Sequence, residues 1–217
     1  MSRFFAQKAR EPMSSYTHFW GALASTIATV LMVVWGILSK SSGIVVVGAA
    51  VFGLSLVALY SASSVYHFVV AGEKCLLRLR KLDHAMIYVL IAGSYTPVCL
   101  AYMDRAKALT FLGAMWGVAV IGILIKLVWL NAPRILYTAL YLAMGWAIVL
   151  DLPALAAMPS GCFGFILAGG LLYSTGAILY IIKRPNLPRG WGFHELFHLF
   201  ILAGSACHVL AVLLFIL

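Results

Sequence analysis

Two histidines, His194 and His198, lie four residues apart where the last apolar segment begins, within Gly190-Trp-Gly-Phe-His-Glu-Leu-Phe-His-Leu-Phe. Side chains at this spacing share one face of a helix, about 5–6 Å apart at Cβ. Two imidazoles placed in this way can bind one metal ion, and histidine nitrogen is a preferred ligand of zinc. The pair therefore predicts part of a metal site, whose other groups must come from elsewhere in the chain.

The composition indicates that most of the chain faces lipid. Of the 217 residues, 64% are hydrophobic and 10% are charged, whereas a soluble globular domain is about half apolar and about a quarter charged. A soluble core of this size cannot hold the excess of apolar residues. The net charge of +9 comes from Lys and Arg residues in short connections between apolar runs. This pattern is typical of membrane topology, so we expect no nucleic-acid partner.

Apolar runs of about 20 residues are long enough to cross a bilayer as helices. The sequence predicts seven such spans in one all-α bundle, which forms a single seven-helix membrane domain over residues 1–217. Residues 1–16 form a short N-terminal segment before the first span. The expected spans are 17–39, 44–68, 82–103, 108–130, 135–150, 162–182 and 194–217.

The basic residues are concentrated on one side of this bundle. On the N-terminal side lie Arg3, Lys8, Arg10, Lys74, Arg78, Arg80, Lys81, Lys126, Arg134, Lys183, Arg184 and Arg189. The opposite side has only Lys40, Arg105 and Lys107. Because basic residues favour the cytoplasmic side, we expect the N-terminus in the cytoplasm and the C-terminus outside.

Further polar residues fall at the membrane level of His194 and His198. His67 ends the second span, Ser63 precedes it by one turn on the same face, and Asp83 opens the third span. Three histidines with an open position are the ligand set of a catalytic zinc site. Asp83 would then hydrogen-bond to the metal-bound water or take its proton, and Ser63 would orient that water or donate to a developing oxyanion.

Each of these residues also has a simpler interpretation. A single histidine at this depth is commonly interfacial, and Asp83 could form a surface ion pair with Lys81. Ionisable residues within a membrane are costly unless they are paired or hydrated. Their joint placement on three helix ends at one level therefore favours a shared metal site.

The roles of four other polar residues near these spans are less definite. Glu11 and His18 could approach the site or lie among the lipid headgroups. His84 points about 100° away from Asp83 on a helix and is a poorer candidate. His208 lies about 15 Å deeper than His198, and we expect it to hydrogen-bond to a neighbouring helix.

Glu195 completes a His-Glu-x-x-His match between His194 and His198. In zinc proteases the glutamate of this motif is the general base. An intramembrane protease is therefore an alternative, although it also requires a third ligand and a groove for an extended peptide.

A set of motifs spread along the chain resembles the bacterial haemolysin III family. The motifs are Ser63-x-x-x-His67, Lys81-Leu-Asp83, Leu90-Ile-Ala-Gly-Ser-Tyr-Thr-Pro97, Tyr141-Leu-Ala-Met-Gly-Trp146, His194-x-x-x-His198 and Gly204-Ser-Ala-Cys-His208, and the resemblance extends back to Glu11-x6-His18. This family belongs with the progestin and adiponectin receptors and is more distantly similar to the alkaline ceramidases. The resemblance implies a seven-helix bundle with zinc near the cytoplasmic face, in the inner membrane of a bacterium.

The resemblance also implies roles for single residues. In the adiponectin receptors one histidine of the second helix and two of the seventh hold the metal, and these positions match His67, His194 and His198. The aspartate that holds the zinc-bound water matches Asp83, and the motif serine matches Ser63. The resemblance gives no protease role to the glutamate between the two last histidines, because that position varies among relatives.

These observations lead to a zinc-dependent hydrolase of a lipid amide or ester as the first functional hypothesis, with membrane lipids as partners. One alternative is a non-catalytic sensor or regulator of membrane homeostasis, in which zinc joins the second, third and seventh helices. Another is a cytolysin or pore-forming haemolysin, which the name of the family implies. The same three histidines suit the enzyme and the sensor equally.

Overall fold

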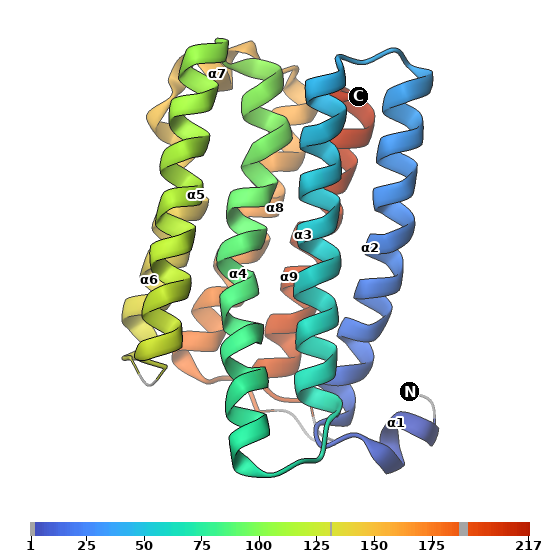
Figure 1. Cartoon of the computed structure of the whole chain (residues 1–217), viewed down its shortest axis with the longest axis vertical. Helices are drawn as coiled ribbons and strands as arrows, with labels where there is room; N and C mark the ends of the chain where they lie inside the picture. Colours follow the sequence, from blue (N-terminus) through green and yellow to red (C-terminus); the bar gives the residue numbers. More distant parts are fainter. Residues whose placement is uncertain (1–2, 131, 187–190) are drawn as a thin grey trace.

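The computed structural model describes residues 3–130, 132–186 and 191–217, and these residues form helices joined by short connections (Figure 1). No β-strand occurs in these ranges, so the predicted all-α fold is confirmed. Gly190 and Arg189, which precede the last helix in the sequence, lie outside the described residues. The elements are α1 (Arg3–Lys8), α2 (Pro12–Leu38), α3 (Gly43–Phe68), α4 (Glu73–Tyr102), α5 (Arg105–Val128), α6 (Arg134–Gly145), η1 (Ala147–Leu150), α7 (Leu152–Ala157), α8 (Ser160–Ile182), α9 (Phe193–Ala211) and η2 (Val212–Ile216).

Within the described ranges, six helices are long and apolar enough to cross a membrane: α2, α3, α4, α5, α8 and α9 continued by η2. The expected fifth span over 135–150 is divided between α6, with 12 residues, and the 3₁₀ helix η1, with 4 residues. Together they rise about 26 Å, close to the hydrocarbon thickness of about 30 Å. The fold is a bundle of six long helices and this shorter seventh segment.

The long helices stand side by side and place the two chain ends at opposite ends of the bundle (Figure 1). Consecutive helices pack on one another from α2 to α5, α8 packs on α9, and α9 also contacts α2. The contact between α3 and α4 is close at Gly48, where a Cβ atom would lie 3.1 Å from the Cα of Pro97. We call the end that holds α1, the last turn of α8 and the first turn of α9 the N-terminal end. Its location in the cytoplasm stays a prediction from the basic residues.

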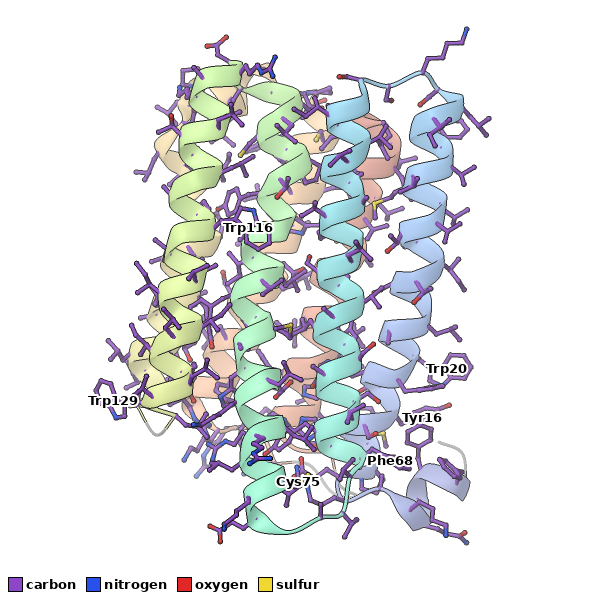
Figure 2. The ribbon with its side chains drawn as sticks, in the orientation of Figure 1. Tyr16, Trp20, Phe68, Cys75, Trp116 and Trp129 are labelled. Carbon is purple, nitrogen blue, oxygen red and sulfur yellow. The ribbon has the colours of Figure 1, made fainter. Side chains whose placement is uncertain are left out.

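The outer surface is apolar, and aromatic side chains mark one boundary of it. Residues such as Val47 and Leu54 on α3 are more than half exposed, at 61% and 62%. Trp20 and Trp129 are also about half exposed, and Figure 2 shows both near the N-terminal end of the bundle. Tryptophan is enriched where a membrane meets water. The N-terminal end therefore reaches one membrane–water interface.

Several boundaries at this end differ from the prediction. Helix α4 begins at Glu73 rather than near residue 82, so the basic residues before Asp83 lie on helical turns and not in a loop. Lys126, which we assigned to a connection, lies in the last turn of α5 and is 1% exposed. Hydropathy detects the lipid-facing part of a helix, and a helix can continue past it.

Candidate metal centre

Three histidines from two helices converge at the N-terminal end of the bundle. His67 lies in the last turn of α3, and His194 and His198 lie in the first two turns of α9. One ring nitrogen from each lies within 4.8 Å of the others. The Nε2 atoms of His67 and His194 are 3.3 Å apart. Tetrahedral zinc with bonds of about 2.0–2.1 Å sets its ligand nitrogens about 3.3–3.4 Å apart, so this pair has the spacing that zinc requires.

Glu11 holds the other side of the His67 ring. Its carboxylate pairs with His67 Nδ1, which leaves Nε2 directed at His194. The backbone N–H of Glu11 also donates to the carbonyl of His67, over 2.9 Å. A carboxylate on the second nitrogen of a metal-binding histidine fixes its orientation and raises its basicity. Burial acts to raise the pKa of Glu11, but the hydrogen bond with His67 and the positive charge of Arg10 outweigh it and lower that pKa, which favours the carboxylate form.

Replacing Glu11 by Gln is expected to weaken zinc binding about 10–100-fold, the usual effect of losing such a partner. The amide keeps the shape of the side chain but removes the charge that stabilises the His67 ring as a ligand. Competition with a chromogenic chelator on the detergent-purified protein measures the affinity. Glu73→Gln removes an exposed carboxylate from α4 at the same end of the bundle and should leave the affinity unchanged. Equal affinities in the two variants would show that Glu11 does not support the ligand.

His198 is buried at 2% exposure, and its Nδ1 atom has no hydrogen-bond partner. An unpartnered ring nitrogen in a buried site is costly, and a bound metal ion would satisfy it. His18 covers this ring, with centroids 3.6 Å apart and planes 8° from parallel. His18 is thus part of the wall of the site and lies outside the group of three convergent ligands.

The two other predicted site residues lie beside the histidines. Ser63 and Asp83 are buried, at 2% and 9% exposure. Both line the same cavity as His194 and His198. His67 converges on those two histidines. The structure therefore brings all five residues of the predicted site together, and their chemical roles stay predictions.

The cavity has a volume of about 280 Å³ and extends from the histidines along the bundle between α4, α6, α8 and α9. Most of its wall is apolar or aromatic, and its far part is formed by residues such as Leu155 and Phe163. Apolar walls with a few convergent polar groups are typical of a small-molecule site. This cavity suits a ligand with a polar group at the histidines and a hydrocarbon part beyond them.

His208 lies farther along the same cavity, but its partner differs from the prediction. Its Nδ1 atom is 3.0 Å from the carbonyl oxygen of Gly204 in its own helix. The ring stacks on Tyr173 of α8, with centroids 5.3 Å apart. The expected hydrogen bond to a neighbouring helix is therefore wrong, because the ring reaches the carbonyl oxygen one turn earlier in its own helix.

Glu195 is engaged at the start of α9. One carboxylate oxygen accepts the backbone N–H of Gly192 and the other accepts the Ser14 hydroxyl, both over 2.9 Å. This is the arrangement of a glutamate that satisfies the free N–H groups at a helix start. The glutamate of the His-Glu-x-x-His match is thus a structural residue that also joins α9 to α2.

Replacing Glu195 by Ala is expected to destabilise the protein by about 0.5–2 kcal/mol, the range measured for lost helix caps. Zinc content should stay the same, because the residue touches no ligand nitrogen. Thermal unfolding and metal analysis of the same purified sample measure both effects. Full stability together with a complete loss of a peptide-cleaving activity would instead favour the protease alternative.

Sequence reasoning left Glu11 and His18 without a role, although one signal could have placed them. Pro12 occupies the first position of α2, where proline favours a helix start. This start puts Glu11 just before the helix and His18 in its second turn, both level with the end of α3. Hydropathy alone did not give this boundary, because α2 begins five residues before its apolar part.

Comparison with known proteins identifies the family of the chain. A family model described as "Haemolysin-III related" matches residues 6–209. The chain is 34% identical to the Hemolysin-3 homolog of Bacillus subtilis (strain 168) over 206 residues, which are 94% of this chain and 93% of that protein. It is 33% identical to Hemolysin-3 of Bacillus cereus over 219 residues, covering 100% of this chain and 96% of the relative.

The chain is also similar, over a shorter part of its length, to a plant protein. The chain is 32% identical over 152 residues to "Heptahelical transmembrane protein ADIPOR2" of Oryza sativa subsp. japonica, covering 61% of this chain and 65% of the plant protein. The name of this plant protein agrees with a relationship to the adiponectin receptors. With the family match over nearly its whole length, this multi-pass membrane protein belongs to the haemolysin III family.

Proposed function

We propose that the protein is a zinc-dependent hydrolase of a lipid amide or ester, which acts at the cytoplasmic side of a bacterial inner membrane. The observation that carries this proposal is that His194, His198, Asp83 and Ser63 line one largely apolar cavity, while His67 converges on the two histidines. The same observation favours a lipid over a water-soluble substrate. Trp20, two residues from His18 on α2, is exposed at the level of a membrane interface, where the carbonyl groups of lipids lie.

The residues of the site have complementary tasks in such a reaction. The three histidine nitrogens would hold zinc, which would supply Lewis-acid chemistry by lowering the pKa of water to about 7 and polarising a carbonyl group. The Asp83 carboxylate accepts a proton from the water that attacks the carbonyl carbon and returns it to the leaving nitrogen or oxygen as the C–N or C–O bond breaks. The Ser63 hydroxyl donates a hydrogen bond to the substrate carbonyl oxygen as negative charge develops there. Glu11 holds His67 in orientation.

A hydrolysis screen tests the proposal directly. The purified protein is mixed in detergent micelles with lipids that carry the same acyl chain in amide or ester linkage, and released fatty acid is measured by mass spectrometry. We expect release from at least one linkage, its loss with a chelator, and its return when zinc is added. Retained zinc without release from any lipid would contradict the hydrolase.

A non-catalytic zinc sensor is a second candidate, which the position of the ligands on α3 and α9 favours. A metal ion bound by residues of two helices contributes to folding as well as to chemistry. Chelation would then lower the unfolding temperature markedly in a protein that turns over no lipid. A cytolysin would instead release dye from liposomes, and His67→Ala would not reduce the leakage.

A further inference from the structure

A second polar cluster adjoins the histidine site and plays no part in the proposed hydrolysis. Its central residue is Lys126 in the last turn of α5, which is 1% exposed. The Nζ atom lies 3.4 Å from the ring centroid of Tyr137 on α6. Its hydrogen bond to the carbonyl of Leu130 is long, at 3.5 Å. A buried ammonium group thus lies against one face of an aromatic ring, with little other compensation.

Arg134 adds a second positive charge close by. Its guanidinium carbon lies 4.3 Å from the ring centroid of Tyr180, and its Nη1 atom donates to the Tyr180 carbonyl over 2.8 Å. The hydroxyls of Tyr137 and Tyr180 are 3.3 Å apart, so the two cation–aromatic pairs form one cluster. Among the described residues, no carboxylate lies within ion-pair distance of Lys126 or Arg134. The cluster therefore has a positive charge that the chain itself does not neutralise.

Two polar atoms beside this cluster have no partner and line the cavity. The hydroxyl of Thr138, which follows Tyr137 on α6 and is 3% exposed, is buried without a hydrogen bond. Every other threonine of the chain donates to a carbonyl of its own helix three or four residues back, as helical threonines commonly do. The Nδ1 atom of His84, across the cavity on α4, is also buried and unpartnered.

The groups of this cluster lie close to the metal centre and share its cavity. The His84 and Tyr137 rings are 6.0 Å apart, and the Tyr180 ring is 6.0 Å from His194. His84, Tyr137, Thr138 and Tyr180 all line the cavity that contains Asp83 and His194. Adjacent residues of a helix point about 100° apart, so Asp83 and His84 serve two different parts of one cavity. The cluster lies within the reach of a single lipid molecule whose scissile bond is at the histidines.

We propose that the part of the cavity wall formed by Tyr137, Thr138 and His84, with Lys126 packed against Tyr137 behind it, is a subsite for an anionic group, such as the phosphate of a lipid headgroup. The Thr138 hydroxyl and a ring N–H of His84 donate to the anion, and Lys126 and Arg134 supply the positive potential behind the tyrosines. Hydrogen bonds to charged groups are stronger than those between neutral groups, and a buried cation strengthens them further. The inference rests on the proposed function in treating the cavity as a lipid site, but it requires neither bound zinc nor hydrolysis.

Native mass spectrometry with two matched lipids tests this subsite. Dioctanoyl phosphatidic acid and dioctanoylglycerol share their acyl chains and differ in the phosphate, and the bound mass distinguishes an intact lipid from a hydrolysed one. We expect the wild-type protein to bind the phosphate-bearing lipid about tenfold more tightly or better, as one or two charge-assisted hydrogen bonds provide. Lys126→Met and Thr138→Val should each remove most of this preference.

Two control variants separate the subsite from general effects. Lys74→Gln removes an exposed charge at the same end of the bundle, and Thr175→Val removes an exposed hydroxyl that bonds within its own helix. Both should keep the wild-type preference. Thr138→Val is nearly isosteric, so it decides the matter if Lys126→Met fails to fold. Competition by inorganic phosphate would identify a free anion as a ligand of the subsite, and its absence would identify the lipid headgroup.

Equal binding of the two lipids by the wild type, or a preference that survives Thr138→Val, would overturn the subsite. These outcomes are distinct from a failure of the proposed function. Hydrolysis without a preference for the phosphate-bearing lipid would support the proposed hydrolase and contradict the subsite. A clear preference for phosphate with no change in lipid mass after zinc is added would leave the subsite and exclude ester hydrolysis of this lipid. Absence of fatty-acid release from both linkages in the hydrolysis screen would then remove the hydrolase.

Discussion

The zinc content of the purified protein is expected to fall from about one ion per chain to nearly none when His67 is replaced by Ala. Three ligands hold zinc in an open site, and His67 is the one ligand that α3 contributes to the pair on α9. Its removal leaves two nitrogens from one helix, which cannot enclose the ion. His194→Ala should have the same effect, because its Nε2 atom is 3.3 Å from that of His67. Inductively coupled plasma mass spectrometry on detergent-purified samples measures the content.

His208 offers a matched control for this loss. It is a histidine of α9 that lines the same cavity, but its Nδ1 atom bonds to Gly204 and the residue is not among the convergent ligands. His208→Ala should therefore keep the ion. A wild-type protein without any metal would contradict both the hydrolase and the metal-joined sensor. Retention of zinc in both His67→Ala and His194→Ala would place the ion elsewhere.

The grouping of His67 with His194 and His198 could be predicted because it depends on simple geometry. The i, i+4 spacing fixes two imidazoles on one helix face, and the order of the spans determines which helix ends share a membrane level. Asp83 was placed correctly at that level, although α4 begins nine residues earlier than predicted. The turns from Glu73 to Lys81 are rich in charge, so a search for apolar runs ends where lipid contact ends.

Other features depend on tertiary contacts that local patterns do not contain. Lys126 was assigned to a connection because basic residues favour the membrane surface. Its burial is possible because Tyr137, from the next helix, offers an aromatic face to the ammonium group. Glu11 received no role because its partner His67 is far away in the sequence, and only the packing of α2 against α3 brings them together. Local patterns thus predicted the ligands better than the residues that support them.

Replacing Asp83 by Asn is expected to reduce lipid turnover by about 10²–10⁴-fold, the usual contribution of a positioned acid–base group, while zinc content is unchanged. The amide keeps the size of the side chain but cannot take up a proton. Asp83 lines the cavity beside His194 and His198 and is not one of the convergent ligands. Fatty-acid release and metal content are therefore measured on the same sample, so that loss of chemistry is distinguished from loss of the ion.

The comparison between Asp83→Asn and Asp104→Asn separates the enzyme from the sensor. Asp104 is exposed before α5, at the opposite end of the bundle from the histidines, so its replacement controls for the loss of one carboxylate. A hydrolase loses turnover in the first variant alone and keeps zinc in both. A sensor turns over no lipid as the wild type or as either variant. It keeps zinc in all three proteins, because the three histidines alone bind the ion. Full turnover by Asp83→Asn with zinc bound would show that Asp83 does not take part in the reaction. Another polar group of the cavity wall would then have to accept the proton, and His18, which stacks on His198, would be the next residue to test.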